Sequence, residues 1–420
     1  MISELKIRNF KSLESVDLKL GHFNLLVGTN ASGKSNFLDA LRFLQGVGNG
    51  LKISEILDGK PSSITSFKWD GIRGGSRFAS FRRKDGSSSK EIEFRVGIPE
   101  TDLYGIRRTN LRYELTFSPG TEKFVQFIED ADRRIWHENE QIRSYLDGQL
   151  SNARHASFFN TAEAYANALR RRNPDLPPQE VESREGLSPA EFNLDPYSVF
   201  VAHVLGAFQD MQFLDPLVAE LTAYSTKATR LGEHGEGFAG LIHEIESSKS
   251  KPALLEWLKE LRPDEISDLN ALSGADNDFM VAIREGNTEF RAPALSEGTL
   301  RFIALAAAFF QPSMPKVLVI EEIEKGLHPS RLRLLLELMR SQSKRTGTQV
   351  FATTHSPTLL NWLTEEDRKT TFVCTRDSDS GATKMRSLAE VPNLEELIKK
   401  NYNLDQLFEE GWLESVLQES

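Results

Sequence analysis

Hydrophobic and polar residues alternate along the first 20 positions of the chain, as they do in β-strands. The apolar positions of this pattern are Leu5, Ile7, Val16, Leu18 and Leu20. Residues 23–27 are almost continuously apolar and predict a further strand, which leads into a glycine-rich turn and an amphipathic helix. Alternation returns between residues 75 and 130, separated by turn-forming segments such as Asp85-Gly86-Ser87. This second region predicts an antiparallel lobe beside the first strands.

The spacing of apolar residues changes to a helical one between residues 131 and about 275. A proline-bearing segment, residues 173–178, interrupts it. No heptad pattern is sustained, so the sequence does not support a long coiled-coil arm. We therefore expect a mostly helical insertion.

Strands return from residue 279 onward. A hairpin is expected around Glu285-Gly286-Asn287, followed by two short apolar strands at 317–320 and 350–352. Each of these two strands precedes a helix that has a proline, Pro329 or Pro357, in its first turn. The final segment, residues 393–420, has apolar residues at helical spacing and predicts a helix packed on the rest, with a docking surface for another protein as the alternative.

The turn after residues 23–27 has the composition of a phosphate-binding loop. Residues 28–35 read Gly-Thr-Asn-Ala-Ser-Gly-Lys-Ser, which fits G-x-x-x-x-G-K-[ST] between a strand and a helix. In such a loop the backbone N–H groups wrap the phosphates, Lys34 reaches the β- and γ-phosphates, and Ser35 ligates Mg²⁺. A glycine-rich turn that only caps a helix is the structural alternative. The surrounding strand and helix favour nucleotide binding.

Two adjacent carboxylates follow the strand at 317–320. Glu321 and Glu322 lie at its carboxyl end, which is where ligands bind in a parallel sheet. Successive side chains point apart, so Glu321 can hold Mg²⁺ while Glu322 activates a water directed at the γ-phosphate. Alone, this pair would more often be a charged surface turn, but the phosphate loop reverses that preference.

Two further candidate segments lie directly before an expected helix. His355 follows the strand at 350–352, and beside the first two motifs it is interpreted as a hydrogen-bonding partner of the γ-phosphate. Leu295-Ser296-Glu297-Gly298-Thr299 precedes an apolar helix, so Ser296 and the N–H groups around Gly298 form a second anion-binding helix start. Alone, this segment would be a helix cap.

Together these motifs resemble the ATP-binding-cassette type ATPases of the RecF, SMC and OLD group. Residues 28–35 are similar to Walker A, 295–299 to the signature, 317–322 to Walker B, 326–328 to the D-loop, and His355 to the H-loop. Residues 7–12 are similar to the N-terminal strand of the group, and the middle of the chain resembles helical inserts of RecF-like bacterial ATPases, many of them in anti-phage defence operons.

The resemblance implies an α/β fold: an ABC-type P-loop NTPase head with a mixed or parallel sheet, flanking helices and an antiparallel β lobe. Residues 1–130 and 279–420 form this discontinuous head, and residues 131–278 form the helical insertion. It also implies a composite site, in which the signature of one head completes the phosphate loop of a second. ATP binding is then expected to close a head-to-head dimer and hydrolysis to open it.

The resemblance assigns residues to ATP, Mg²⁺ and catalysis. Lys34, Glu322 and His355 are the expected catalytic residues, and Ser35 and Glu321 the Mg²⁺ ligands. The residues expected to contact ATP are Asn30, Ala31, Ser32, Gly33, Lys34, Ser35, Asn36, Ser296 and Gly298.

The chain also departs from the pattern of these ATPases at several positions. Glu321 stands where they usually have Asp, and His328 replaces the D-loop Asp. The Q-loop glutamine is not unique, with Gln209, Gln212 and Gln126 as candidates.

Composition limits the biological roles. The chain of 420 residues has 51 basic and 61 acidic side chains, a net charge of −10, which argues against a polybasic binder. The single cysteine, Cys374, excludes an intramolecular disulfide. The first residues lack the apolar stretch of a signal peptide, and the longest apolar run falls short of the about 20 residues of a membrane span, so a cytoplasmic protein is expected.

Three functions follow from these patterns. The first is an ATPase that acts as sensor or scaffold for a separate effector, a nuclease or a toxin, in anti-phage defence. The 63 residues after Pro357 are too few for the Toprim nuclease domain that OLD proteins carry, and Asp377-Ser378-Asp379 is interpreted as a hairpin turn. The second is a RecF-like repair ATPase that binds DNA through basic clusters such as Arg82-Arg83-Lys84. The third is the nucleotide-binding subunit of a transporter, which the N-terminal strands and the large insertion disfavour.

Overall fold

The architecture was obtained as a computed structural model of the whole chain. The structure describes residues 1–61, 68–89, 91–99, 101–103, 106–108, 111–119, 124–130, 133–138, 204–261, 266–400, 402–412 and 415–416. The chain forms two compact units, and it passes between them several times. The first unit comprises residues 1–20, 35–210 and 376–385, and the second comprises residues 21–34, 211–375 and 386–420.

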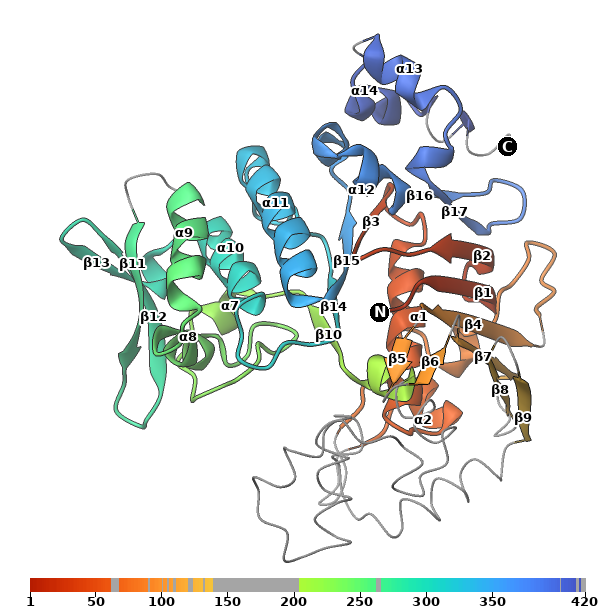
Figure 1. Ribbon diagram of the computed structural model, residues 1–420, viewed down its shortest axis with the longest axis horizontal. Coiled ribbons are helices and arrows are strands. Elements are labelled where there is room, and N and C mark those ends of the chain that lie inside the picture. Colours follow the sequence, from red (N-terminus) through yellow and green to blue (C-terminus); the bar gives the residue numbers. More distant parts are fainter. Residues whose placement is uncertain are drawn as a thin grey trace, which may run out of the picture. The chain divides into compact units, whose positions relative to one another are not determined.

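The first unit contains an antiparallel sheet in the order β2-β1-β4-β7-β8-β9 (Figure 1). Its strands are β1 (Glu4–Phe10), β2 (Leu13–Lys19), β4 (Ile92–Ile98), β7 (Leu111–Phe117), β8 (Phe124–Asp130) and β9 (Arg133–Glu138). Two short strands, β5 (Thr101–Leu103) and β6 (Ile106–Arg108), pair separately. The alternation in the sequence is matched by alternating burial in β4, which confirms the expected antiparallel lobe.

Helix α1 (Lys34–Gly48) packs on this lobe through aromatic side chains. Phe43 stacks on Phe94 and Phe117, with ring centroids 5.0 and 4.8 Å apart, and Phe10 meets Phe94 edge-on at 5.3 Å. Such aromatic pairs contribute about 0.5–1.5 kcal/mol each beyond the area that they bury. The unit also contains α2 (Ile53–Asp58) and the 3₁₀-helix η1 (Ser76–Phe78).

A second sheet has the order β10-β14-β15-β3-β16-β17, and its strands β10, β14, β15 and β3 lie wholly in the second unit. Its strands are β10 (Met211–Leu214), β14 (Val317–Ile320), β15 (Gln349–Thr354), β3 (Phe23–Val27), β16 (Thr371–Arg376) and β17 (Thr383–Ser387). The first five strands pair in parallel. Strands β3, β10, β14 and β15 are buried along their whole length, as expected for a parallel sheet covered on both faces.

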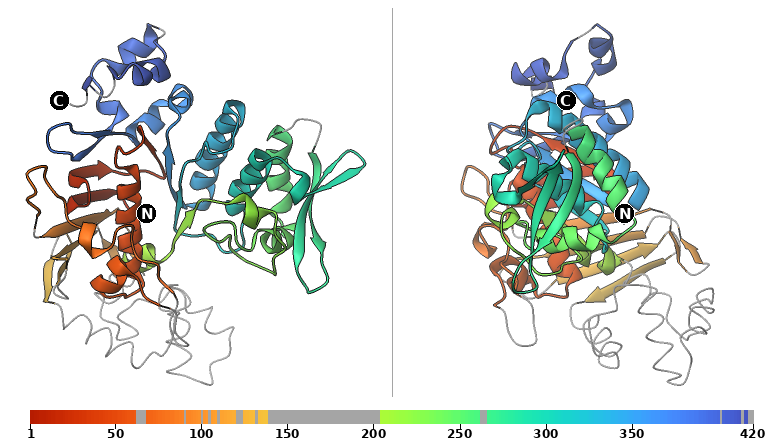
Figure 2. Two further views of the ribbon diagram at one scale, coloured as in Figure 1. Left: turned by 180° about the vertical axis from the view of Figure 1, so that it is seen from behind. Right: turned by 90° about the vertical axis from the view of Figure 1, so that its left-hand side faces the viewer.

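Helices and a smaller sheet complete the second unit. Strands β11 (Ile266–Ser273), β12 (Phe279–Glu285) and β13 (Thr288–Arg291) form an antiparallel sheet, with α8 (Phe238–Glu246) and α9 (Lys251–Leu261) packed on it, as Figure 2 shows from two sides. The remaining helical elements are α7 (Val218–Leu221), η3 (Ala292–Ala294), α10 (Glu297–Ala308), α11 (Pro329–Thr346), η4 (Pro357–Trp362), α12 (Glu365–Lys369), η5 (Leu388–Glu390), α13 (Leu394–Lys399) and α14 (Leu404–Glu409).

Several expected elements are present and some differ. The hairpin at Gly286 joins β12 to β13, and Pro329 begins α11 as expected. The helix expected after β15 is the 3₁₀-helix η4, and in place of a single C-terminal helix the described residues include two separate short helices, α13 and α14. Strands β9, β10 and β11 fall within 131–278, where helices were expected, because strand pairing overrides a local spacing of apolar residues that does not alternate. The boundaries of the insertion stay a prediction, since residues 139–203 lie outside the described part.

Candidate active site

The carboxyl ends of four neighbouring strands meet at one edge of the parallel sheet. Leu214 of β10 lies opposite Ile320 of β14, which lies opposite Ala352 of β15, and Ala352 in turn lies opposite Leu25 of β3. The segments that follow these strands therefore leave the sheet side by side. This register brings together groups that are up to 327 positions apart in the sequence, as the contact between Gly28 and His355 shows.

The loop after β3 has a backbone that only small residues allow. A Cβ on Gly28 would lie 2.5 Å from the carbonyl oxygen of Cys374 and 2.7 Å from Ser32 Oγ. Ala31 and Gly33 have φ values of 63° and 105°, in the left-handed region. Asn30 and Ala31 are exposed, whereas Ser32 is buried. The loop thus has the close packing and unusual turns of a phosphate-binding loop.

Lys34 lies under this loop and is 4% exposed. Its Nζ donates hydrogen bonds to the carbonyl oxygens of Gly28 at 2.6 Å and Thr29 at 2.9 Å, and to Nδ1 of His355 at 3.1 Å. Burial lowers the pKa of the Lys34 ammonium, while the nearby Cys374, Glu324 and Glu322 oppose that shift. A bound phosphate would offset the electrostatic cost of burying the Lys34 ammonium, because it places negative charge beside the cation.

Glu322 follows β14 in a backbone conformation that non-glycine residues rarely adopt, with a φ of 47°. Its N–H donates to Thr353 Oγ1 at 2.9 Å, and its carboxylate oxygen Oε1 lies 3.2 Å from Nε2 of His355. A conformation of this kind costs of order 1–3 kcal/mol and persists only where neighbours hold it. The next strand in the chain, β15, therefore helps to orient the Glu322 side chain through Thr353.

His355 links the lysine to the carboxylate. Its Nδ1 lies 3.1 Å from the Lys34 ammonium and 3.2 Å from the carbonyl oxygen of Gly28, and its Nε2 lies 3.2 Å from Glu322 Oε1. The backbone N–H of His355 donates to Glu324 Oε1. Glu324 Oε2 is buried and has no hydrogen-bond partner among the described residues. Two carboxylates, Glu322 and Glu324, thus face the lysine and histidine.

The expected signature is the start of α10. Ser296 is exposed and caps this helix, because its Oγ accepts from the N–H of Thr299 at 3.2 Å. Gly298 is buried against the chain's own loop after β14, where a Cβ would lie 2.3 Å from the carbonyl oxygen of Gly326. His328, which replaces the D-loop Asp, caps α11 through Ser330. Both motifs therefore have packing roles within the chain.

Comparison with known proteins identifies the family. A family model described as "AAA domain, putative AbiEii toxin, Type IV TA system" matches residues 23–361, well over half of the chain. The chain belongs to this AAA domain family. The matched region spans the phosphate loop, Glu321 and Glu322, and His355, so the AAA domain contains the whole candidate site.

Two curated relatives resemble this AAA domain protein over most of their length. An "ATP/GTP phosphatase" of Helicobacter pylori is 23% identical over 385 residues, covering 89% of this chain and 90% of the relative. A "DNA replication and repair protein RecF" of Streptococcus uberis is 23% identical over 372 residues, covering 84% and 93%. These matches confirm the resemblance to RecF-like ATPases.

A solved structure shows the same fold. The crystal structure of an Smc head bound to the C-winged helix domain of ScpA matches with a TM-score of 0.52 and 17% identity, over 95% of this chain and 99% of that one. The expected α/β P-loop NTPase fold is confirmed. Within the described part of the AAA domain protein, no helix is both long enough and apolar enough to cross a membrane.

The expected Mg²⁺ ligands and the remaining nucleotide contacts stay predictions. Ser35 is exposed in α1, and its carbonyl oxygen accepts from Arg73 at 2.7 Å. The side-chain amide of Asn36 donates to Ser12 Oγ at 2.6 Å. Glu321 lies directly after β14. No group of three His, Cys, Asp or Glu side chains that could hold a metal occurs in the described ranges, but Mg²⁺ bound with phosphates uses only one or two carboxylates.

The structure does not single out one of the three glutamines as the Q-loop residue. Gln212 is buried in β10, where Nε2 donates to the carbonyl oxygen of Leu231 at 2.6 Å and Oε1 accepts from Gln311 at 2.7 Å. Gln209 contacts Asn49 at 3.4 Å. Gln126 lies in β8. Gln212 is occupied by packing, which makes it the weakest of the three candidates.

Sequence reasoning missed four residues of the AAA domain's site. Thr353 and Glu324 hold the backbone of Glu322 and His355, as described above. Arg301 of α10 and Asp215 after β10 form an ion pair at 3.1 Å. The sequence did mark Arg301 as unusual, because it is a charged residue between the apolar residues of α10. Thr353 carried no such signal, because a threonine at the end of a strand is common.

Proposed function

We propose that this AAA domain protein hydrolyses ATP, with Glu322 as the general base and Lys34 and His355 as ligands of the γ-phosphate. The observation that carries the proposal is the hydrogen-bonded line from Lys34 Nζ through the His355 ring to Glu322, with distances of 3.1 and 3.2 Å. It supports a site in which phosphate ligands and a base lie at one sheet edge.

The residues fit the roles that this reaction needs. The Glu322 side chain is 47% exposed and His355 engages only Oε1, so Oε2 is available to accept a proton from water. The Lys34 ammonium can exchange its carbonyl partners for phosphate oxygens. Mg²⁺, when bound, neutralises charge on the phosphates, and the Ser35 hydroxyl and Glu321 carboxylate would hold it.

Replacing Glu322 tests the assignment of the base. Because Glu322→Gln cannot accept a proton, we expect kcat to fall by about 10²- to 10⁴-fold while the Kd for ATP stays the same. Lys34→Ala should instead weaken ATP binding, since it removes the buried cation. Glu337→Gln, on the exposed face of α11, is the matched control and should keep the parent rate. Hydrolysis by Glu322→Gln at the parent rate would show that another group is the base.

We infer further that two copies of the chain dimerise through ATP, with Ser296 and Gly298 of one copy completing the site of the other. The exposure of Ser296 at the start of a 12-residue helix supports this, since helix N-termini bind phosphate. Light scattering on Glu322→Gln should show a dimer with ATP and a monomer without it. Lys34→Ala should remain monomeric in both conditions, and a dimer of Lys34→Ala in ATP would contradict the inference.

We propose that the ATPase controls a separate effector, a nuclease or a toxin, in a defence system. The support is the description of the family, which names a toxin of a type IV toxin–antitoxin system. The test is capture of tagged Glu322→Gln protein from its host in ATP, with Lys34→Ala as the control. A stoichiometric protein that is retained after nuclease treatment, and absent from the control, supports an effector. Capture of DNA alone would contradict it.

RecF-like DNA binding is the alternative, and one surface favours it. Phe78 is 49% exposed, and the guanidinium groups of Arg77 and Arg82 each lie 5.4 Å from its ring. An exposed ring between two cations suits nucleic acid, which offers phosphates and stackable bases. If this surface binds DNA, Arg77→Ala with Arg82→Ala should weaken DNA binding and reduce its salt dependence. An unchanged affinity would remove this reason for the alternative.

A further inference from the structure

Arg301 is a buried charge at the start of the apolar stretch of α10. It lies in α10, five residues after Ser296, and is 1% exposed. One terminal nitrogen donates to Asp215 Oδ1 at 3.1 Å and to the carbonyl oxygen of Pro216 at 2.6 Å. The other donates to the carbonyl oxygens of Glu321 at 3.2 Å and Glu322 at 3.3 Å. Burying a guanidinium is costly, so these four contacts determine where α10 can sit.

The contacts to Glu321 and Glu322 act on the backbone that carries the proposed base. Arg301 holds the carbonyl side of Glu322, and Thr353 holds its N–H at 2.9 Å. The left-handed φ of 47° is thus fixed from both sides. Because one guanidinium nitrogen binds two successive carbonyls, a shift of Arg301 turns both peptides and redirects the Glu322 side chain.

Asp215 extends this connection to the loop after β14. Its Oδ1 also lies 3.3 Å from Lys325 Nζ, so it pairs with two cations from different elements. Lys325 precedes Gly326, whose carbonyl oxygen leaves no room for a Cβ on Gly298. Helix α10 therefore meets the loop that carries Glu322 both at Gly298 in its first turn and at Arg301, about 4.5 Å further along the helix axis.

We propose that Arg301 is a positioning residue that couples the start of α10 to Glu322. When α10 is seated, Arg301 holds the carbonyls of Glu321 and Glu322 so that the Glu322 carboxylate faces His355 and the phosphate loop. When α10 shifts, the same contacts turn the Glu322 carboxylate away from His355 and the phosphate loop. The inference deepens the proposed function, because it rests on Glu322 as the base.

The test separates chemistry from binding. Arg301→Met should lower kcat by about 10- to 100-fold, the usual effect of misplacing a catalytic group, with less than a threefold change in the Kd of a fluorescent ATP analogue. Arg301→Lys keeps the charge beside Asp215 but reaches fewer carbonyls, so its kcat should lie between those of Arg301→Met and the parent. Arg333→Met, on the exposed face of α11, is the matched control and should keep the parent values.

A double-mutant cycle distinguishes positioning from general loss of structure. In the Glu322→Gln background there is no base to aim, so Arg301→Met should change the single-turnover rate by less than threefold. A further drop as large as in the parent would overturn the inference, as would equal losses in kcat and in ATP affinity. If Glu322→Gln is inactive but Arg301→Met is fully active, only the positioning role fails. If Glu322→Gln is fully active, the proposed base fails and the positioning role with it.

Discussion

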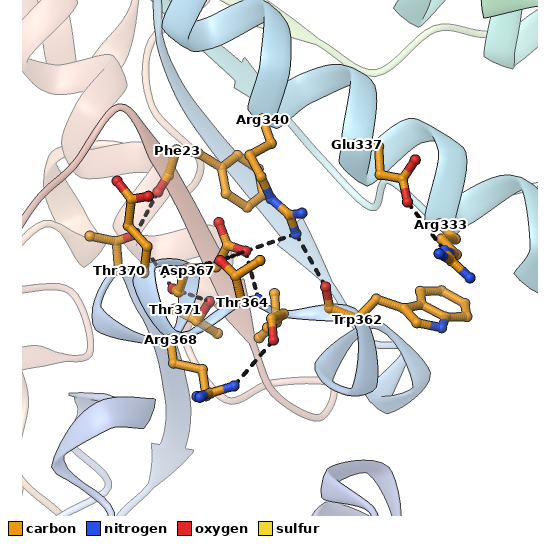
Figure 3. Close-up of polar contacts among 12 residues, drawn as sticks. Phe23, Arg333, Glu337, Arg340, Trp362, Thr364, Asp367, Arg368, Thr370 and Thr371 are labelled. Carbon is orange, nitrogen blue, oxygen red and sulfur yellow. Dashed lines mark hydrogen bonds and ion pairs between the residues drawn. The ribbon is translucent and has the colours of Figure 1, made fainter. Parts of the chain in front are cut away.

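Arg340 and the buried Asp367 form a partly buried ion pair whose removal should destabilise the second unit without changing its chemistry. Figure 3 shows Arg340 of α11 reaching Asp367 of α12 and the carbonyl oxygen of Trp362. The Arg340–Asp367 distance is 2.8 Å, and the two side chains are 20% and 6% exposed. Asp367 Oδ2 also accepts hydrogen bonds from the N–H and hydroxyl of Thr364. Arg340→Met would leave this carboxylate buried without its cation.

The size of the effect follows from these contacts. A hydrogen bond to a charged group contributes about 1.5–3 kcal/mol, and breaking a buried pair costs about 3–5 kcal/mol. The two bonds from Thr364 remain and offset part of the loss, so we expect the free energy of unfolding to fall by about 2–4 kcal/mol. Arg333, on the same helix, pairs with Glu337 at 3.2 Å, and these two side chains are 64% and 45% exposed. Arg333→Met should therefore cost at most about 0.5 kcal/mol.

Urea unfolding of both variants, followed by circular dichroism, measures the difference. Kinetics at 20 °C should be unchanged in Arg340→Met, because the cluster lies at the first residues of β3 and β16, where Thr370 Oγ1 donates to the carbonyl oxygen of Phe23 at 2.7 Å. The phosphate loop leaves from the other end of β3. Equal unfolding midpoints for the two variants would refute the reasoning, and so would a raised KM for ATP in Arg340→Met.

Three further predictions concern residues at the phosphate loop and beside Glu322. Burial raises the pKa of the Cys374 thiol to about 12 from 9.0, so the folded protein should resist iodoacetamide at pH 8 and react only in denaturant. The stability that this raised pKa provides is present below pH 9 and lost between 9 and 12, so wild type should lose about 1.4 kcal/mol more than Cys374→Ala between pH 8 and pH 10. Gly28→Ala places a Cβ 2.5 Å from the carbonyl oxygen of Cys374 and should abolish ATP binding in a fluorescence titration. Thr353→Val removes the acceptor of the Glu322 N–H and should lower kcat, whereas Thr353→Ser should retain it.

The fold was largely predictable from the sequence because its strong signals are local. The apolar run of β3, the glycines at 28 and 33, and the prolines at 329 and 357 each specify a strand, a turn or a helix start from a few neighbouring residues. Strand β10 was missed for the opposite reason. Its four residues are buried only because they pair with β14, more than 100 positions away.

The same distinction applies to the site. Lys34, Glu322 and His355 could be selected as a set because each follows or ends a strand in a recognisable segment. Their supports could not, since Thr353 and Glu324 act through hydrogen bonds to backbone groups, which leave no pattern in the sequence. Arg301 is intermediate, because a charge in an apolar helix indicates a buried partner but does not say which one.

Helix α10 joins two functions that the sequence motifs keep apart. Ser296 caps its exposed start, Gly298 meets Gly326 in its first turn, and the Arg301 guanidinium donates to the carbonyl oxygens of Glu321 and Glu322. A ligand that binds at Ser296 would therefore act on the helix that we propose orients Glu322, the proposed base. Since Gly298 also packs within its own chain, its replacement would disturb the Glu322 loop even without a second copy. Effects that depend on a partner are accordingly best tested at Ser296, whose hydroxyl, within the described part of the chain, forms hydrogen bonds to Thr299 of the helix that it caps.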